Sequence, residues 1–173
     1  MEEKEIIKQI TKGKIFIYPT DTIYGLGCDA TNIRSVNKIK EIKQRDLNRP
    51  LSVIAPSAQW IKENFVVDVD LEKYLPGPYT MILKKKNPNF LFHVSSTDLL
   101  GVRIPNHEFT NIIQKAGLPF ITTSVNLSGE PFIKEISEVS HDILEHIDHI
   151  IDYGPLIGNP SVLIKDGKEV KRE

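Results

Sequence analysis

The sequence predicts an α/β fold, α+β in some schemes, built on an open, twisted, mixed β-sheet flanked by helices. Short runs rich in β-branched residues alternate with amphipathic segments through most of the chain, as strands and helices do. The carboxyl-terminal stretch and the region around Thr80 look antiparallel, so the sheet should be mixed. A length of 173 residues with 40% hydrophobic content suits one domain over residues 1–173, and no repeat or low-complexity linker divides it.

The first half of the chain is expected to alternate helices and strands. Gly13 follows a run of isoleucines at helical spacing, and Pro19 ends the next apolar run because proline lacks a ladder donor. Asn32 is a suitable N-cap for a second helix. The predicted elements are a helix over 2–12, a strand over 15–18, a helix over 33–42, a strand over 51–54 and a short helix capped by Ser57.

The second half holds shorter elements bounded by proline and glycine. Pro105 ends an apolar strand, Gly117 follows an amphipathic helix, and Asp166-Gly167 suits a tight hairpin turn. The predicted elements are a helical turn over 71–75, strands over 80–83, 100–104, 120–124 and 149–152, helices over 108–116 and 135–147, and a hairpin of 161–164 with 169–171.

Composition narrows the class of protein. A formal net charge of −1 gives no global attraction to nucleic acid or membranes, so an anion site must come from local clustering of cations. The single cysteine, Cys28, excludes an intramolecular disulfide and a multi-cysteine zinc site, and we expect it to be buried. No run approaches the roughly 20 apolar residues of a membrane-spanning helix, and the amino terminus lacks a signal-like core. We therefore expect a cytoplasmic protein with no membrane partner.

Small polar side chains follow the first predicted strand. Thr20, Asp21 and Thr22 supply two hydroxyls and a carboxylate just past the strand's carboxyl end, where open α/β sheets bind ligands. Gly25 and Gly27 are expected either to let backbone amides approach such a ligand or to supply positive φ angles. An ordinary strand-to-turn connection explains the Thr-Asp-Thr stretch equally well, so other stretches must decide.

Cations gather where the helix over 33–42 gives way to a strand. Lys43, Arg45 and Arg49 lie within seven residues, a spacing that suits a phosphate clamp. Arg103 lies among apolar neighbours and needs a partner. Taken alone, Lys43, Arg45 and Arg49 are better explained as a solvated helix end, and a structural ion pair explains Arg103 as well as a functional role does.

A second polar turn, with Ser124 and Asn126, follows the strand over 120–124; alone it could be an Asx-type turn. Joined at one edge of the sheet, the polar turns and the cations would stabilise the charge that builds up in phosphoryl transfer. The sequence has no Walker-type loop, and Gly25-x-Gly27 is only a fragment of a dinucleotide fingerprint, which disfavours the standard nucleotide folds.

Two other polar groups are predicted to be surface features. The run Lys84–Lys86 follows a strand and is expected to form a solvated edge. His141, His146 and His149, with Asp142 and Asp148, are expected to be exposed rather than to bind a metal, because nothing in their spacing fixes a convergent geometry.

Four ordered motifs run through the chain. They are Pro19–Leu26, Lys43-x-Arg45, Gly101–His107 and Ser124-x-Asn126-x-Ser128-Gly129. In this order and spacing they resemble the YrdC family of threonylcarbamoyl-AMP synthases, and the resemblance extends over about residues 6–164. It implies a single domain whose open sheet surrounds a basic concave cavity. Family members join ATP, L-threonine and bicarbonate or carbon dioxide into threonylcarbamoyl-AMP and pyrophosphate, for threonylcarbamoyladenosine formation at position 37 of tRNA.

The resemblance also implies roles for residues of this chain. Implied to bind L-threonine are Thr22, Arg103, Ser124 and Ser161. Implied to bind ATP are Lys43, Arg45, Arg49, Asn126 and Arg172. Catalysis would rest on positioning and charge stabilisation by Lys43, Arg45, Ser124 and Asn126. Mg²⁺ would arrive with ATP, without a dedicated set of protein ligands, and a downstream threonylcarbamoyl-transferase machinery would receive the product.

The sequence departs from the family pattern at the cation motif. The family commonly has Lys-Gly-Arg-Pro, whereas this chain has Lys43-Gln44-Arg45-Asp46 followed by Arg49. The extra arginine is expected to replace an ATP contact and Asp46 to weaken one. The chain also looks like the short form, without the additional carboxyl-terminal domain of longer members.

Three other functions remain open. The domain could bind tRNA or other RNA through phosphate contacts without chemistry. It could be a paralogue without synthase activity. It could also perform the carbamoyl-adenylate chemistry of hydrogenase-maturation carbamoyltransferases, although the acylphosphatase-like and zinc-finger parts of those proteins are absent from this sequence.

Overall fold

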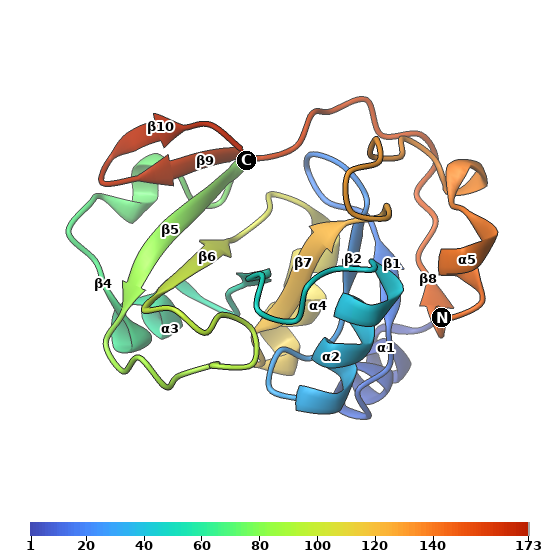
Figure 1. Cartoon of the computed structure of the whole chain (residues 1–173), viewed down its shortest axis with the longest axis horizontal. Helices are drawn as coiled ribbons and strands as arrows, with labels where there is room; N and C mark the ends of the chain where they lie inside the picture. Colours follow the sequence, from blue (N-terminus) through green and yellow to red (C-terminus); the bar gives the residue numbers. More distant parts are fainter. Residues whose placement is uncertain (173) are drawn as a thin grey trace.

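The computed structural model describes residues 1–172, which form an open, twisted, mixed sheet flanked by helices (Figure 1). The strands are β1 (Phe16–Tyr18), β2 (Gly25–Gly27), β3 (Ser52–Ile54), β4 (Phe65–Val66), β5 (Tyr79–Lys85), β6 (Leu99–Arg103), β7 (Phe120–Ser124), β8 (His149–Ile150), β9 (Val162–Lys165) and β10 (Lys168–Val170). Their order is β10-β9-β5-β6-β3-β7-β2-β1-β8, and β4 pairs with β5 beside this path. The predicted fold class is confirmed.

Parallel and antiparallel pairs are mixed within the sheet. Strand pairs β1–β8, β3–β6 and β5–β9 are parallel, whereas β5 is antiparallel to β6, as predicted for the Thr80 region. The predicted terminal hairpin forms between β9 and β10, where Asp166 and Gly167 have φ of 52° and 73°. Because β5 lies between β6 and β9, the end of β6 and the start of β9 meet near Thr80.

Helices cover both faces of the sheet. They are α1 (Glu3–Thr11), α2 (Ile33–Ile42), α3 (Ala58–Asn64), α4 (Glu108–Ala116) and α5 (His141–Leu144), with 3-10 turns η1 (Leu71–Lys73) and η2 (Ile136–Glu138). Ile10 of α1 and Phe109 of α4 pack with Phe16 and Tyr18 of β1 in one core cluster. Ile17 points to the opposite face and joins the larger cluster with the buried side of α2.

Helix α2 delivers the cation-bearing loop. Asn32 caps it as predicted, its Oδ1 accepting from the Ser35 N–H at 3.1 Å. The helix ends at Lys43, and Gln44 then has a φ of 53°, in the left-handed region. This turn, at the position where the resembling family commonly has glycine, directs residues 45–50 away from the helix axis.

The predicted helix over 135–147 is wrong. Only η2 and α5 are helical, and the extended Val139 separates them. The Glu138 side chain accepts from the backbone N–H of Glu135, which closes a capping box around a single turn instead of starting a long helix. The predicted strand over 149–152 is reduced to β8, and β2 and β4 were missed.

Gly25 and Gly27 form strand β2, and the prediction of positive φ at these positions is wrong. A Cβ on Gly25 would lie 2.6 Å from the Tyr18 ring, and one on Gly27 would lie 2.0 Å from the Ile121 carbonyl oxygen. The neighbouring strands of the sheet alone therefore require glycine at both positions, and Gly25 also lines the cleft described below.

The prediction of a solvated basic run holds for two of its three lysines. Lys84 and Lys86 are exposed, but Lys85 is only 2% exposed. Its Nζ donates to the carbonyls of Pro88, Phe90 and Ser95 at 3.1, 2.9 and 2.8 Å. Strand alternation turns Lys85 inward, where the 86–98 loop supplies the acceptors.

Cys28 is buried as predicted, and burial together with Asp29 raises the pKa of its thiol well above the usual value.

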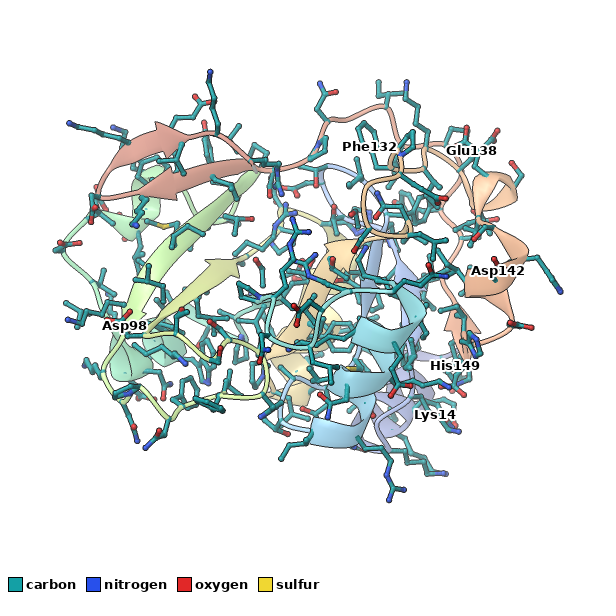
Figure 2. All side chains as sticks on the ribbon, viewed as in Figure 1. Lys14, Asp98, Phe132, Glu138, Asp142 and His149 are labelled. Carbon is teal, nitrogen blue, oxygen red and sulfur yellow. The ribbon has the colours of Figure 1, made fainter. Side chains whose placement is uncertain are left out.

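The histidines near α5 serve packing and surface contacts. His149 lies against Phe16, with ring centroids 5.0 Å apart, and its neighbour Asp148 forms an ion pair with Lys14. Figure 2 shows Lys14 and His149 on the same side of the molecule. Within residues 1–172, no group of three His, Cys, Asp or Glu side chains is placed to hold a metal ion. In the same range, no helix is long and apolar enough to cross a membrane.

Candidate functional site

A cleft of about 840 Å³ opens where the ends of β6 and β7 meet the Thr20–Gly25 turn, the loop after α2 and the β9–β10 hairpin. Seven lysine or arginine residues line it, against one acidic residue, Glu130. Such an excess of one charge in a concave site concentrates positive potential. All nine predicted site residues line this cleft: Thr22, Lys43, Arg45, Arg49, Arg103, Ser124, Asn126, Ser161 and Arg172.

One end of the cleft is formed by hydroxyls and a guanidinium. Thr20 Oγ1 donates to the Ile23 carbonyl at 2.7 Å and accepts from the Thr22 N–H at 3.0 Å, which fixes the turn. Arg103, at the end of β6, donates from Nη1 to Thr22 Oγ1 at 3.2 Å. The turn and β6, 81 residues apart in the chain, thus present a hydroxyl beside a guanidinium.

Asp21 is the charge partner of Arg103. Its Oδ1 accepts from Arg103 Nη2 at 2.5 Å, and its Oδ2 accepts from the Asn106 N–H at 2.9 Å. Arg103 is only 5% exposed; burial lowers its pKa, and Asp21 opposes that shift, so the guanidinium stays charged. Sequence reasoning noted Asp21 within the Thr-Asp-Thr turn but assigned it no role. The need of Arg103 for a partner was the signal.

Lys43 joins α2 to the turn after β7. Its side chain is buried, and Nζ donates to the carbonyls of Ser124 and Asn126 at 2.6 and 2.9 Å and to Asn126 Oδ1 at 2.9 Å. The Lys43 carbonyl also accepts from the Ser128 N–H at 3.0 Å. Burial, followed by Arg45 and Arg49, lowers the pKa of Lys43 to about 7. In this conformation the ammonium uses all three donors on the polar turn.

Near Lys43, hydrogen bonds between residues close in the sequence orient the other polar side chains of the cleft. Arg45 Nη2 donates to the Pro50 carbonyl at 2.7 Å, while Arg49 is exposed. Ser124 Oγ donates to Asn126 Oδ1 at 2.7 Å. This end of the cleft therefore offers two guanidiniums and a hydroxyl–amide pair, which suits a phosphate chain.

The carboxyl-terminal hairpin brings Ser161 and Arg172 together. Arg172 Nη2 donates to Ser161 Oγ at 2.8 Å, and its Nε donates to the Ser161 carbonyl at 3.2 Å. Thr80 Oγ1 and Ser161 Oγ share a hydrogen bond of 2.6 Å. The Thr80 hydroxyl, which nothing in the sequence pattern of β5 distinguishes, thus belongs to the same cluster.

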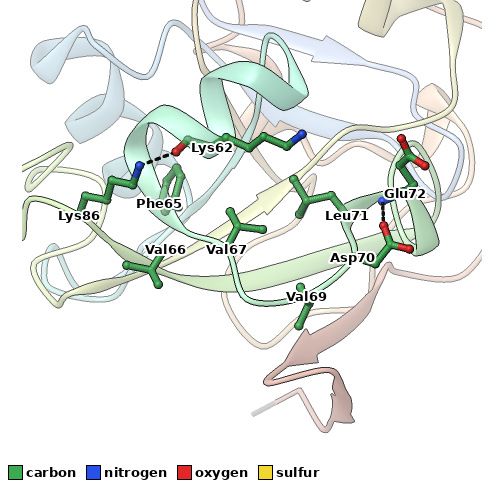
Figure 3. A pocket seen from close by; sticks show the side chains of 9 residues that line it. All are labelled: Lys62, Phe65, Val66, Val67, Val69, Asp70, Leu71, Glu72 and Lys86. Atoms are coloured by element: carbon green, nitrogen blue, oxygen red, sulfur yellow. Dashed lines mark hydrogen bonds between the residues drawn. The ribbon is translucent and has the colours of Figure 1, made fainter.

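A second hollow of about 570 Å³ lies beside β4 and shares no residue with the cleft (Figure 3). Valine, leucine and phenylalanine side chains form much of its wall, and Lys86 donates to the Lys62 carbonyl at 2.6 Å on its rim. It combines two lysines with two carboxylates, Asp70 and Glu72, so it lacks the charge excess of the cleft.

The fold and the cleft define an α/β protein whose cationic site suits a small molecule that carries phosphate or carboxylate groups. The family model Sua5/YciO/YrdC, described as telomere recombination, matches residues 8–172. The chain therefore belongs to the Sua5/YciO/YrdC family. Threonylcarbamoyl-AMP synthase of Pseudoalteromonas translucida is 32% identical over 174 residues, covering 94% of this chain and 91% of that protein.

Two solved structures share the fold over nearly the whole chain. E. coli YciO has a TM-score of 0.82 and 25% identity, covering 97% of this chain and 86% of YciO. P. abyssi Sua5 in complex with L-threonine has a TM-score of 0.80 and 29% identity. That match covers 97% of this chain but 52% of the Sua5 chain, so the present chain spans about half of that longer protein.

Proposed function

We propose that this protein is an L-threonylcarbamoyl-AMP synthase, a nucleotidyltransferase that consumes ATP, L-threonine and bicarbonate or carbon dioxide. One observation carries the proposal: the hydroxyl–guanidinium end at Thr22 and Arg103 and the cationic end at Arg45 and Arg49 share a single cleft. The first end suits a hydroxy amino acid, and the second suits a triphosphate. The relatives named threonylcarbamoyl-AMP synthase support this pairing of substrates.

At the amino-acid end, Arg103 would bind the threonine carboxylate. Asp21 already accepts from Nη2, so the substrate carboxylate would share the guanidinium and approach it on the side of Thr22. Ser161, held between Thr80 and Arg172, would supply a further hydroxyl to the amino acid.

The chemistry needs no nucleophilic side chain. The uncharged amine of L-threonine attacks carbon dioxide and loses a proton, which forms an N–C bond and a carbamate. A carbamate oxygen then attacks the α-phosphorus of ATP, the bond to the bridging oxygen breaks, and pyrophosphate leaves. Arg45 and Arg49 would stabilise charge on the phosphates and the leaving group, and the shared cleft would hold the reacting atoms together.

The turn after β7 would lie between the two substrates. Lys43 fixes this turn by its three hydrogen bonds, so that Ser124 and Asn126 keep one orientation while the phosphates change charge. Mg²⁺ bound with ATP would neutralise part of the phosphate charge. Hydroxyls, one amide and a single carboxylate at Glu130 suit a metal carried by phosphates and water better than one held in a protein cage.

The product is a mixed anhydride that a later enzyme must use. We therefore propose a cytoplasmic role in which a threonylcarbamoyl-transferase machinery passes the group to tRNA. The AMP group activates the carbamoyl carbon: when an amine of the tRNA attacks that carbon, a C–N bond forms, the bond to the phosphate oxygen breaks, the amine loses a proton and AMP leaves.

Pyrophosphate release from ATP and bicarbonate, with and without L-threonine, tests the proposal. We expect threonine-dependent release from the wild type, and a loss of about 100-fold in Arg45→Ala because a charge-stabilising group is removed. Arg34→Ala, which removes an exposed arginine of α2 outside the cleft, is the matched control and should keep full activity. Folded wild type without threonine-dependent release would refute the proposal and favour an RNA-binding module or an inactive paralogue.

A further inference from the structure

Helix α2 carries a second buried lysine that the proposed reaction does not use. Lys40 is only 3% exposed, yet its ammonium forms no ion pair with a carboxylate of residues 1–172. Nζ donates to the Leu47 carbonyl at 2.6 Å and to the His93 carbonyl at 2.9 Å. Burial of a cation is unfavourable unless its donors are hydrogen-bonded, so these two contacts offset part of the cost of burying Lys40.

The Leu47 carbonyl lies at the tip of the loop that holds Arg45 and Arg49. Within residues 44–50 every side chain except that of Arg45 is exposed, and the Leu47 side chain itself is 56% exposed. The loop therefore has almost no apolar packing to hold it. The backbone N–H groups of Gln44 and Arg45 close the end of α2 by donating to the Glu41 and Lys40 carbonyls. Beyond that turn, the other polar contacts of residues 46–50 stay within the loop: Asn48 N–H donates to Asp46 Oδ1 at 2.8 Å, Arg49 N–H donates to the Asp46 carbonyl at 3.0 Å, and Arg45 Nη2 donates to the Pro50 carbonyl.

The second partner of Lys40 belongs to a well-anchored segment. The 86–98 loop converges on Lys85 through three carbonyls, as described above. His93 Nε2 lies 2.6 Å from the Ala30 carbonyl, and the Leu51 N–H donates to the Val94 carbonyl at 3.1 Å. Lys40 therefore ties the tip of an exposed loop to a segment that is fixed at several points.

We propose that Lys40 is a positioning residue for the ATP end of the cleft: its ammonium bridges the Leu47 and His93 carbonyls and so holds Arg45 and Arg49 toward the phosphates. The inference rests on the proposed use of ATP. Burial lowers the pKa of Lys40, and Arg45 lowers it further while Asp46 opposes the shift, which agrees with a tether close to the charged part of this loop. The hydrogen bonds described for the threonine end, between Arg103, Thr22 and Asp21, involve neither Lys40 nor its two carbonyl partners.

The test compares Lys40→Met with Lys38→Met, which removes an exposed lysine from the same helix. We expect the Kd of MgATP, measured by calorimetry, to rise roughly tenfold in Lys40→Met, because misplaced charged groups lose much of their contribution to binding. The Kd of L-threonine should change less than about twofold, and Lys38→Met should match the wild type for both ligands. Amide hydrogen exchange should accelerate over 45–51 and not in β6 or β7.

Wild-type MgATP affinity in folded Lys40→Met would overturn the inference. If that variant does not fold, Lys40→Gln replaces it, because an amide can still donate to one of the two carbonyls. It should show an intermediate loss of MgATP affinity, and wild-type affinity would again refute the role. Wild type that binds MgATP but makes no threonine-dependent pyrophosphate would refute the proposed function while leaving the Lys40 result decisive. Wild type that binds no MgATP would refute both.

Discussion

Replacing Gln44 by glycine should stabilise the protein. Gln44 follows Lys43, the C-cap residue of α2, with a φ of 53°, and its side chain is exposed. Its N–H donates to the Glu41 carbonyl and the Arg45 N–H donates to the Lys40 carbonyl, both at 2.9 Å, so this backbone shape closes the helix. The left-handed region costs a residue with a Cβ about 1–2 kcal/mol.

The net gain is smaller than the strain it relieves. Glycine loses more conformational freedom on folding, which costs about 0.5–1 kcal/mol. The difference leaves a stabilisation of about 0.5–1 kcal/mol, or roughly 1–4 °C in Tm for a chain of this size. Urea and thermal unfolding followed by circular dichroism measure both quantities.

The matched control places the same substitution in a right-handed helix. Gln114 is an exposed position within α4, where Gln114→Gly should destabilise the protein by about 1 kcal/mol. The two variants should therefore shift the urea midpoint in opposite directions. A destabilisation by Gln44→Gly similar to that of Gln114→Gly would refute the assignment of strain to position 44.

Three further predictions concern buried groups. Asp21→Asn should raise the Kd of L-threonine about tenfold and destabilise the fold by about 3 kcal/mol, because it leaves the Arg103 charge unpaired. Ligand titration and unfolding measure the two effects, with the exposed Asp68→Asn as the control. Effects no larger than those of the control would contradict the prediction. The folded pKa of Lys43, about 7, lies below the ordinary lysine value of 10.5, so the unfolded chain holds more protons between these values and stability should rise with pH across that window. The free energy of unfolding should increase more steeply with pH in the wild type than in Lys43→Met. Equal slopes in the two proteins would refute the prediction. Gly27→Ala should cost about 3 kcal/mol or more, since its Cβ would meet the Ile121 carbonyl; wild-type thermal stability would show that β2 can shift.

Local signals predicted the elements that depend on local chemistry. The N-cap at Asn32, the hairpin at Asp166-Gly167 and the helix closed by Gly117 all form as predicted. The prediction of a helix over 135–147 was wrong, although the residues that limit it to a single turn also lie within this segment. Glu135 and Glu138 form a capping box, which the sequence analysis read as part of a longer helix.

Features that depend on distant segments could not be read in the same way. Nothing near Lys85 in the sequence shows that three loop carbonyls will surround its ammonium. Gly25 and Gly27 carried a correct signal of close approach, and a ring and a carbonyl of the adjoining strands are the neighbours that a Cβ would meet. Propensity and periodicity do not contain such contacts.

The nine predicted site residues lie together in the cleft because their motifs are specific, whereas the network that holds them could not be predicted. Asp21 and Arg103 are 82 residues apart, so their pairing follows only from the sheet order. Lys40 did carry a signal that went unused. Together with Val36, Ile39 and Lys43 it recurs at spacings of three and four residues, which places both lysines on the buried face of α2.

Direct identification of the product tests the central claim. Protein supplied with MgATP, L-threonine and ¹³C-bicarbonate should yield threonylcarbamoyl-AMP whose mass, measured by liquid chromatography and mass spectrometry, is one unit above that of the product from unlabelled bicarbonate. Omission of L-threonine should abolish the species. The contrary result is protein that binds both ATP and L-threonine but forms only AMP and pyrophosphate, with no labelled adduct. The cleft would then hydrolyse ATP without joining the three substrates, which would contradict the proposed function.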